Sequence, residues 1–409
     1  MYSVLIFSLV ALTTTIFLHL ILPRFAHSVG LVDHPNTRKS HQGRVPLIGG
    51  IAMYIGFVIA FISLDVSWAY KFVFLLASGI VFLTGLIDDI NELSAKQRFM
   101  AQAIAAIIMA VGAGHVLHDL GAIGIGGGTV SLGTFAIPFT IFATIGVINA
   151  LNMSDGIDGL AGGLSVVSLI GFAIAAWFAG MHDHLQVLLL LISVVTAFLL
   201  FNFRFPGRSR ALVFMGDAGS TFLGFALAWF AISLSQGEQR AIAPVTALWL
   251  IALPLFDTVA IMLRRILKKR SPFSADREHL HHAFVLSGLG VAPSALIIFA
   301  LSITAVIVGL YSHYKGFSEA TMFYLFLATF AFYFVSMRRV WSTLRFLWLS
   351  IERRCTRDRR TGDRRTNSSD SSAWNGVERR TSGERRNALD RREIAALRKE
   401  LSGYSEATR

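Results

Sequence analysis

A chain of 409 residues that is 54% hydrophobic and only 15% charged, with a mean hydropathy of +0.60, is too apolar for a soluble globular protein. Its single cysteine, Cys355, lies in a polar segment, which excludes an internal disulfide and a metal site built from thiolates. The net charge of +12 is concentrated in residues 338–409, with 19 of the 37 Lys and Arg residues against 10 of the 25 Asp and Glu residues, and such a segment favours contact with anionic membrane lipids over nucleic acid.

The apolar stretches predict an all-α fold of about eleven membrane-spanning helices, since one span needs about 20 apolar residues. The first stretch has no basic residue ahead of it, and Arg24 follows it. This order predicts a membrane helix with its N-terminus outside rather than a cleaved signal peptide. The predicted spans cover residues 3–22, 47–64, 71–87, 99–114, 135–151, 160–180, 185–203, 219–236, 241–263, 292–312 and 320–337.

Basic residues in the loops predict the orientation of these spans, because cytoplasmic loops are rich in Lys and Arg. With the N-terminus outside, only Lys71, Arg240 and Lys315 fall on the outer side. An odd number of spans also places the basic C-terminal segment in the cytoplasm. The fifteen basic residues on the cytoplasmic side are Arg24, Arg38, Lys39, Arg44, Lys96, Arg98, Arg204, Arg208, Arg210, Arg264, Arg265, Lys268, Lys269, Arg270 and Arg277.

The C-terminal segment divides the chain into a membrane domain, residues 1–340, and a basic cytoplasmic tail, residues 341–409. The tail repeats pairs of arginines, such as Arg359-Arg360 and Arg364-Arg365, and Ser and Asn fill residues 367–372. This composition predicts a largely disordered, solvated segment beside the membrane. Recruitment of a cytoplasmic partner by the tail stays open as the alternative.

A polar, basic segment, residues 33–44, precedes the second predicted span and ends at Arg44. The segment is placed to lie across the cytoplasmic side of the bundle, where it would bind an anionic substrate. An ordinary solvated loop is an equally good interpretation of these residues alone.

Asp88 and Asp89 close the third predicted span. Adjacent carboxylates repel each other, so a bound cation is the simplest way to keep both ionised, and oxygen ligands suit Mg²⁺ or Mn²⁺. Lys96 follows at a distance that suits neutralisation of a diphosphate. The simpler alternative is a solvated acidic pair at a helix end.

Three polar residues follow the fifth span at intervals of three: Asn152, Asp155 and Asp158. If the helix continues, they share roughly one face. If Gly156 and Gly159 break the helix, backbone N–H groups become available to a ligand. Either arrangement suits binding of a nucleotide or a sugar, whereas a polar helix cap would need only one such residue.

Asp217 lies in the run Met215-Gly216-Asp217-Ala218-Gly219-Ser220, at the start of the eighth span. This position predicts a residue at or near the helix N-cap, which is a structural role in itself. The flanking glycines also permit close approach of a phosphate or a metal ion.

His279, His281 and His282 follow Arg277 and a basic loop. Histidines so closely spaced serve as hydrogen-bond donors to phosphate oxygens, as proton carriers or as metal ligands. A zinc site would find only aspartates as further ligands in this chain, so we favour contact with phosphate.

Taken together and in this order, these motifs resemble the polyprenyl-phosphate N-acetylhexosamine-1-phosphate transferase family over roughly residues 1–340. Within the family they are most similar to the bacterial branch that begins O-antigen synthesis, rather than to the peptidoglycan-precursor branch, which has three consecutive histidines. The matching motifs are His41-Gln42-Gly43 with Pro46 and Gly49-Gly50, Asp88-Asp89, residues 152–159, residues 215–220, and Ser271-Pro272-Phe273-Ser274 before Asp276-Arg277 and His279-Leu280-His281-His282.

The resemblance implies transfer of N-acetylglucosamine 1-phosphate from UDP-N-acetylglucosamine to undecaprenyl phosphate in the bacterial inner membrane, with Mg²⁺ or Mn²⁺. It implies that Asp217 and Asp88 hold the metal, and that Asp88, Asp89, Asp155 and Asp158 act in catalysis. Substrate contacts would fall to Asn152, Lys96, His279, His281, His282, Arg277 and Arg44. Direct attack and a covalent aspartyl-phosphate both stay open, as does homodimer formation.

Other functions fit the sequence less well. The same reaction with another UDP-N-acetylhexosamine stays open. A secondary transporter of an anionic solute would explain the many spans, but transporters carry their charges near mid-membrane and often show repeated halves. A scaffold acting through its tail would leave the aspartates unexplained.

Overall fold

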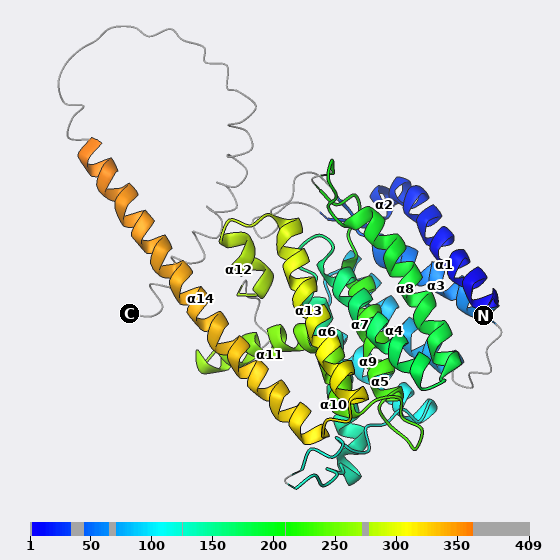
Figure 1. Cartoon of the computed structure of the whole chain (residues 1–409). Coiled ribbons are helices and arrows are strands. Elements are labelled where there is room, and N and C mark those ends of the chain that lie inside the picture. Colours follow the sequence, from blue (N-terminus) through cyan, green and yellow to red (C-terminus); the bar gives the residue numbers. More distant parts are fainter. Residues whose placement is uncertain are drawn as a thin grey trace.

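The computed structural model describes residues 2–33, 45–64, 71–124, 126–208, 210–271 and 278–362, and these residues form a helical bundle (Figure 1). The helices of the first half are α1 (Tyr2–Ile21), α2 (Pro23–Val29), α3 (Gly49–Ser63), α4 (Lys71–Ile90), α5 (Ala95–Ile107) with a π-helical turn (Ile108–Gly112), and α6 (Ala136–Ser154), which a short 3₁₀ turn (Gly133–Phe135) precedes. Those of the second half are α7 (Leu160–Phe178), α8 (His182–Asn202), α9 (Gly216–Ser233), α10 (Pro244–Leu250), α11 (Ala252–Leu267), α12 (Leu280–Leu286), α13 (Val291–Tyr314) and α14 (Glu319–Gly362).

The only sheet within the described residues is a pair of two-residue antiparallel strands, β1 (Val32–Asp33) and β2 (Val45–Pro46). The fold is therefore all-α, as the sequence predicts. The strands join the two ends of the polar segment between the first and second predicted spans. The carbonyl of Pro46 also accepts a hydrogen bond from the N–H of Phe214, which joins β2 to the segment just before α9.

Seven helical segments in the described chain are long and apolar enough to cross a membrane, so the protein is a membrane protein. The bent pair α10 and α11 makes an eighth if it counts as one span. Each predicted span matches a helix, but α3 has only 15 residues, and neither α5 nor α9 meets the same criteria. The count of eleven is therefore not confirmed. The seven segments are Val4–Ile21, Lys71–Ile90, Gly133–Ser154, Leu160–Phe178, His182–Asn202, Val291–Tyr314 and Glu319–Thr343.

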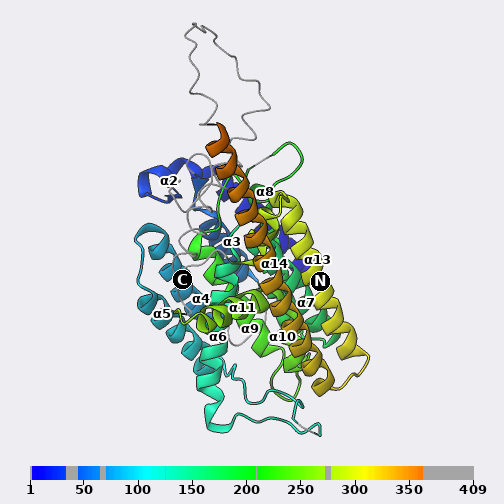
Figure 2. The same ribbon diagram turned by 90° about the vertical axis from the view of Figure 1, so that its left-hand side faces the viewer.

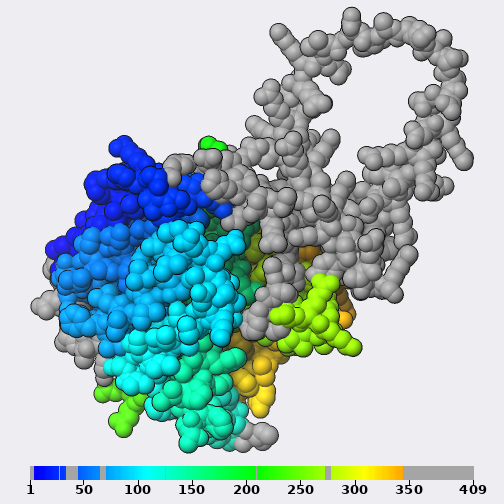
Figure 3. Space-filling model, turned by 180° about the vertical axis from the view of Figure 1, so that it is seen from behind, coloured from blue at the N-terminus to red at the C-terminus, as the bar shows by residue number. Residues whose placement is uncertain are grey.

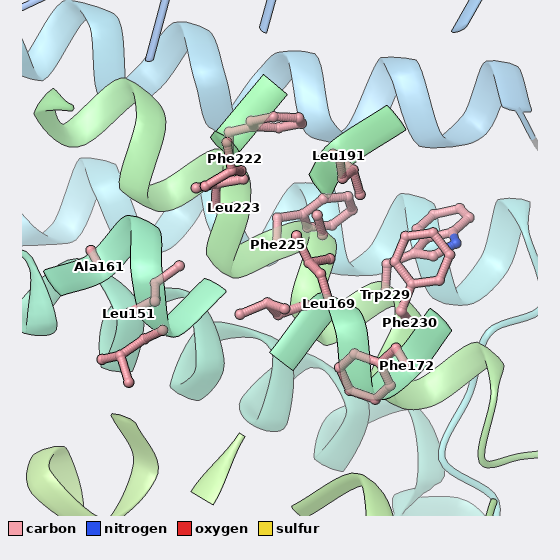
Figure 4. Close-up of a cluster of buried hydrophobic side chains, with 14 of the residues drawn as sticks. Leu151, Ala161, Leu169, Phe172, Leu191, Phe222, Leu223, Phe225, Trp229 and Phe230 are labelled. Carbon is pink, nitrogen blue, oxygen red and sulfur yellow. The ribbon is translucent and has the colours of Figure 1, made fainter. Parts of the chain in front are cut away.

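Helix α9 lies in the centre of the bundle. All its residues from Ala218 to Ser233 are buried, as expected of a helix that is apolar on every side. Its aromatic residues pack with α7 and α8 in one large core, where Phe225 and Trp229 lie near Phe172 and Leu191 (Figure 4). Helices α4 and α6 pack most extensively against α9, so the chain brings the ends of these three helices together.

Glycines allow the closest of these helix contacts. A Cβ atom on Gly85 of α4 would lie 2.6 Å from the backbone N of Ala218 at the start of α9. On Gly50 of α3 it would lie 2.3 Å from the backbone N of Gly219. A larger residue at Gly85 would push the N-terminus of α9, with Asp217, away from α4, and one at Gly50 would push it away from α3.

The ninth predicted span, residues 241–263, is not a straight helix. Helices α10 and α11 meet at an angle of 84° around Ile251, and Figure 1 shows α11 lying across the direction of α13. Helix α11 buries Asp257, Arg264 and Arg265 on one side, while Val259 and Leu263 are exposed on the other. The bend thus turns a buried aspartate into the interior of the bundle.

Helix α14 is the longest, and it runs without a break to Gly362, past the predicted domain boundary at residue 340. Figures 1 and 2 show its C-terminal end extending beyond the other helices. Residues 363–409, which hold most of the predicted tail, lie outside the described residues. Seen from behind, the helices of the N-terminal half cover most of the described face of the protein (Figure 3).

Candidate active site

The side chain of Asp88 is held at the end of α4 by two contacts. Its Oδ1 accepts a hydrogen bond of 2.6 Å from the backbone N–H of Leu93, and its Oδ2 forms an ion pair of 3.0 Å with Nη1 of Arg98. Asp88 is buried, whereas 40% of the Arg98 side chain is exposed. The buried carboxylate therefore has one cationic partner, which solvent also reaches.

Asp89 is turned toward the start of α9. Its carboxylate accepts hydrogen bonds from the backbone N–H groups of Asp217, at 2.7 Å, and Ala218, at 3.1 Å. These N–H groups have no partner within the helix, and a negative charge there is also favoured by the helix dipole. Gly216 makes room, since it has a φ of +73° and any Cβ atom there would lie 2.5 Å from Asp89 Oδ2.

Asp217 stands in the first turn of α9, as the sequence predicts, and faces α6 and α4. Its Oδ1 accepts a hydrogen bond of 2.7 Å from Nδ2 of Asn152, which also donates to Ser220 Oγ at 2.9 Å. The carboxyl groups of Asp217 and Asp88 line the same pocket and are close enough to repel each other. The residues around the pocket at this point are Val81, Thr84, Gly85, Asp88, Arg98, Gln102, Asn149, Asn152, Asp217 and Thr221.

Arg98 reaches this pocket because of how α5 begins. Ser94 and Gln97 form a reciprocal capping box, which fixes the first turn of the helix next to the end of α4. Gln102, one turn further along, accepts a hydrogen bond from Asn149 of α6 at 2.7 Å. Lys96, the predicted neutralising residue, is exposed on the same turn.

Helix α6 ends at Ser154, so Asn152, Asp155 and Asp158 do not share one helix face. The loop that follows is fastened to the segment between α8 and α9: Asp158 forms an ion pair of 2.6 Å with Arg204 and accepts a hydrogen bond of 3.0 Å from the N–H of Ala211. Sequence reasoning thus proposed two alternatives here, and the broken helix is the one that forms.

Two further features fix this loop. Gly159 has a φ of +82°, and its N–H donates to Asn202 Oδ1 at 2.6 Å. Asp155 keeps contact with solvent. Even so, the protein that surrounds it displaces part of its hydration and raises its pKa to about 7, and the charges of Asp217, Asp158 and Asp89 add to this effect.

The histidine segment packs against the loop that follows α6. A Cβ atom on Gly156 would lie 2.1 Å from Nε2 of His281, so only glycine fits where the imidazole packs on the loop. Burial lowers the pKa of His281 well below its usual value, and His282 and His279 lower it further, so His281 is neutral at physiological pH. The rings of His281 and His282 lie 4.2 Å apart.

His279 does not join the aspartate cluster. Its Nδ1 lies 2.8 Å from Oδ2 of Asp257, a buried residue of α11 that sequence reasoning missed. Asp257, His279 and His281 offer ligand atoms that all lie within 4.8 Å of one another. Arg98, Asn149 and Gln102 were not singled out as site residues either, although the polar composition of the α5 and α6 ends was a usable signal.

Two predicted substrate-binding residues, Arg44 and Arg277, lie outside the described residues. The described part of the site therefore has two halves. The first half is formed by the ends of α4, α6 and α9, which carry Asp88, Asp89, Asn152 and Asp217. The second half is formed by the histidine segment and α11. The loop of residues 155–159 lies between them, because Asp155 interacts with Asp217 and Gly156 contacts His281.

The chain is similar to known proteins along most of its length. A profile described as glycosyl transferase family 4 matches residues 71–235. Undecaprenyl-phosphate alpha-N-acetylglucosaminyl 1-phosphate transferase of Escherichia coli (strain K12) is 40% identical over 349 residues, which are 85% of this chain and 94% of the relative. The proteins of the same name from Yersinia pestis and Haemophilus influenzae are each 38% identical, over 79% and 81% of this chain and 88% and 93% of their own lengths. The chain therefore belongs to the family of undecaprenyl-phosphate alpha-N-acetylglucosaminyl 1-phosphate transferases, within glycosyl transferase family 4.

Proposed function

We propose that this protein transfers N-acetylglucosamine 1-phosphate from UDP-N-acetylglucosamine to undecaprenyl phosphate, giving undecaprenyl-pyrophosphoryl-N-acetylglucosamine and UMP. The observation that carries the proposal is the meeting of Asp88, Asp217 and Asn152 at three helix ends, in a chain whose relatives carry this activity in their names. A buried and a half-buried carboxyl group in one small pocket, Asp88 and Asp217, repel each other unless a cation or a proton joins them.

The carboxylates of Asp88 and Asp217 are the best candidates to hold Mg²⁺ or Mn²⁺. Both offer hard oxygen ligands, as these ions prefer, and one or two carboxylates plus substrate phosphates are the usual ligand set for Mg²⁺. When bound, such an ion offsets the charge of the diphosphate and orients it for displacement. Asn152 fixes Asp217 by its amide, and Asp89 fixes the backbone that carries Asp217.

The remaining polar groups suit a reaction between two polyanions. The attacking oxygen belongs to a phosphate monoester with a second pKa of about 6, so it needs no strong base at neutral pH. Charge compensation and positioning supply most of the rate in phosphoryl transfer. Arg98 and Lys96 bring positive charge to the end of α4, and neutral His281 is able to donate a hydrogen bond to a phosphate oxygen.

The catalytic roles of Asp155 and Asp158 follow from their places in the loop. Asp155 is next to the aspartate cluster, and with a pKa of about 7 it is suited to take or give a proton. Asp158, paired with Arg204 and Ala211, supports the loop and keeps Gly156 against His281. Arg277, Arg44 and His282 complete the proposed substrate contacts.

The proposed location is the bacterial inner membrane with the site facing the cytoplasm. The helix ends that carry the aspartates adjoin the loops rich in Lys and Arg, which the positive-inside rule places in the cytoplasm, where UDP-sugars are made available to the enzyme. The product would be the first lipid-linked intermediate of a surface polysaccharide such as O-antigen.

The test is a transfer assay with the full-length protein purified in detergent. UDP-N-acetylglucosamine with a radiolabelled sugar and undecaprenyl phosphate should give a labelled lipid and an equal amount of UMP, and only when Mg²⁺ or Mn²⁺ is present. UDP-N-acetylgalactosamine in a parallel assay tests the alternative donor. No labelled lipid from any UDP-N-acetylhexosamine would overturn the proposal.

A further inference from the structure

We infer that Asp257 is a positioning residue for the histidine segment: it holds His279, and through it His281 and His282, in the orientation that meets the phosphates of the nucleotide sugar. The inference rests on the proposed function, since it assigns the histidines to that substrate. It adds a residue from α11 and a second from α14, Tyr333, to the site.

Asp257 accepts hydrogen bonds from three groups, two at the start of α12 and one on α14. Its Oδ2 lies 2.8 Å from Nδ1 of His279, and its Oδ1 lies 3.0 Å from the backbone N of Leu280 and 2.8 Å from the hydroxyl of Tyr333. Both Asp257 and His279 are buried. One carboxylate therefore joins α11, the start of α12 and α14 at a single point.

These contacts determine the state of the His279 ring. Because a carboxylate is an acceptor, Nδ1 of His279 must carry the proton, and its Nε2 is then the nitrogen left for another partner. The N–H of Leu280 belongs to the first turn of α12, where N–H groups lack helical partners. Asp257 thus fixes both the ring and the backbone of the short helix that carries His281 and His282.

Burial of an acidic residue in a membrane protein costs free energy, and the hydrogen bonds to Asp257 offset this cost. Arg264 of α11 and Lys268, just after it, form ion pairs with Glu278 instead of with Asp257. Two imidazoles and a carboxylate within 4.8 Å also invite comparison with a metal site. Both oxygens of Asp257 are already hydrogen-bonded, however, and a metal ion would have to displace the His279 proton from its partner.

The experiment compares Asp257→Asn with the wild-type enzyme in the full-length protein. An asparagine cannot accept from all three donors, so we expect kcat/KM for UDP-N-acetylglucosamine to fall about tenfold to hundredfold. The KM for undecaprenyl phosphate should not change. In a His279→Ala background, Asp257→Asn should cost less than about a further twofold, because residues that act through one another are not additive.

Glu319→Gln is the matched control. Glu319 is also a largely buried carboxylate with two partners: it pairs with Arg240 at 2.6 Å and accepts from the N–H of Ala122 at 2.7 Å. It lies 14 residues before Tyr333 on α14, about 21 Å along the helix. The substitution Glu319→Gln should lower the melting temperature and leave the KM values for both substrates unchanged. Tyr333→Phe takes the place of Asp257→Asn in the experiment if that variant does not fold. It removes only one donor, so we expect a smaller decrease in kcat/KM for UDP-N-acetylglucosamine.

The outcomes separate the two proposals. Three results would each overturn the positioning role. The first is that Asp257→Asn and Tyr333→Phe keep the wild-type kinetic constants. The second is that the losses from Asp257→Asn and His279→Ala multiply fully in the double variant, and the third is stoichiometric zinc in the wild type that Asp257→Asn lacks. No turnover by the wild type would instead overturn the proposed function. In that case UMP binding decides the inference: UMP should raise the melting temperature of the wild type but not of Asp257→Asn, and no effect on the wild type would overturn both.

Discussion

The carboxylate of Asp89 accepts a hydrogen bond from the backbone N–H of Asp217 over 2.7 Å, so a predicted catalytic residue caps the helix that carries a predicted metal ligand. Adjacent acids at the end of α4 thereby have different partners. Asp88 pairs with Arg98 and shares a pocket with Asp217, whereas Asp89 binds the backbone N–H groups of Asp217 and Ala218. This arrangement divides the pair into a residue that faces the pocket and one that supports it.

Asp89→Asn should therefore act on both stability and activity. The amide leaves one of the two N–H groups at the start of α9 without an acceptor, which costs about 1–2 kcal/mol. We expect a lower melting temperature in detergent together with a loss of turnover that added Mg²⁺ does not restore. Glu92→Gln, at an exposed position just after α4, should leave both quantities unchanged. Wild-type stability in Asp89→Asn would contradict the capping role.

Asp217→Asn should abolish transfer and leave the fold intact. The asparagine oxygen is still able to accept from Asn152, so the contacts of α6 with α9 survive. The melting temperature should match that of the wild type in EDTA, but Mg²⁺ should stabilise only the wild type. Chelation of the wild type should stop turnover, and Mg²⁺ or Mn²⁺ should restore it. Substantial activity of Asp217→Asn at saturating Mg²⁺ would remove Asp217 from the metal ligands.

Much of this site was predictable from the sequence, because Asp88, Asp89, Asn152 and Asp217 lie at the ends of apolar stretches, where polar residues are conspicuous. Which basic residue pairs with Asp88 could not be predicted from the sequence. Lys96 and Arg98 look alike in the sequence, and only the capped first turn of α5 decides that Arg98 reaches the carboxylate.

Asp257 was missed for a different reason. It stands inside a predicted span, and its partners His279 and Tyr333 are 22 and 76 residues away. The bend of 84° between α10 and α11 brings them together, and no local pattern encodes that bend beyond Pro254 near the start of α11. Helices could thus be predicted from composition, but long-range side-chain contacts could not.

Acid should destabilise the protein through His281. Its pKa in the folded state is well below its usual value, so below about pH 6.5 the unfolded state binds a proton that the folded state does not. Above that pH the ring is neutral in both states and does not affect the free energy of unfolding. As the pH falls below it, the free energy of unfolding decreases. The melting temperature of His281→Gln should consequently decrease less than that of the wild type between pH 7 and pH 5.

His118→Gln is the control for this comparison, because His118 is exposed at another part of the chain. Its melting temperature should follow the wild-type curve at every pH. Parallel curves for His281→Gln and the wild type would show that His281 does not sense the pH in this range.

The tail beyond α14 should be dispensable for chemistry in detergent. Residues 363–409 contain none of the proposed substrate contacts, and a cut after Gly362 keeps α14 whole with Tyr333 in place. We expect the truncated enzyme to retain the kcat and both KM values of the full chain. A large loss of kcat would show that the tail contributes to the site, and loss of binding only to anionic vesicles would support the predicted contact with membrane lipids.

Arg98 gives the sharpest test of how the aspartates are held before substrate arrives. Its guanidinium is the cation that offsets the charge of buried Asp88, so Arg98→Gln leaves Asp88 and Asp217 with less compensation. We expect a lower melting temperature in EDTA, a larger stabilisation by Mg²⁺ than in the wild type, and a KM for UDP-N-acetylglucosamine raised about tenfold, as for the loss of about one charge-assisted contact. Arg98→Lys keeps the positive charge but should recover only part of the loss, because an ammonium is more strongly hydrated than a guanidinium and is therefore costlier to bring to a buried carboxylate.

Lys71→Gln is the control, since Lys71 is a basic residue at the opposite end of α4, where it contacts the ring of Phe72. It should change neither the KM nor the response to Mg²⁺. If Arg98→Gln keeps the wild-type KM and gains nothing extra from Mg²⁺, the ion pair with Asp88 is not part of the working site. The positive charge near the aspartates would then have to come from Lys96 on the neighbouring surface of α5.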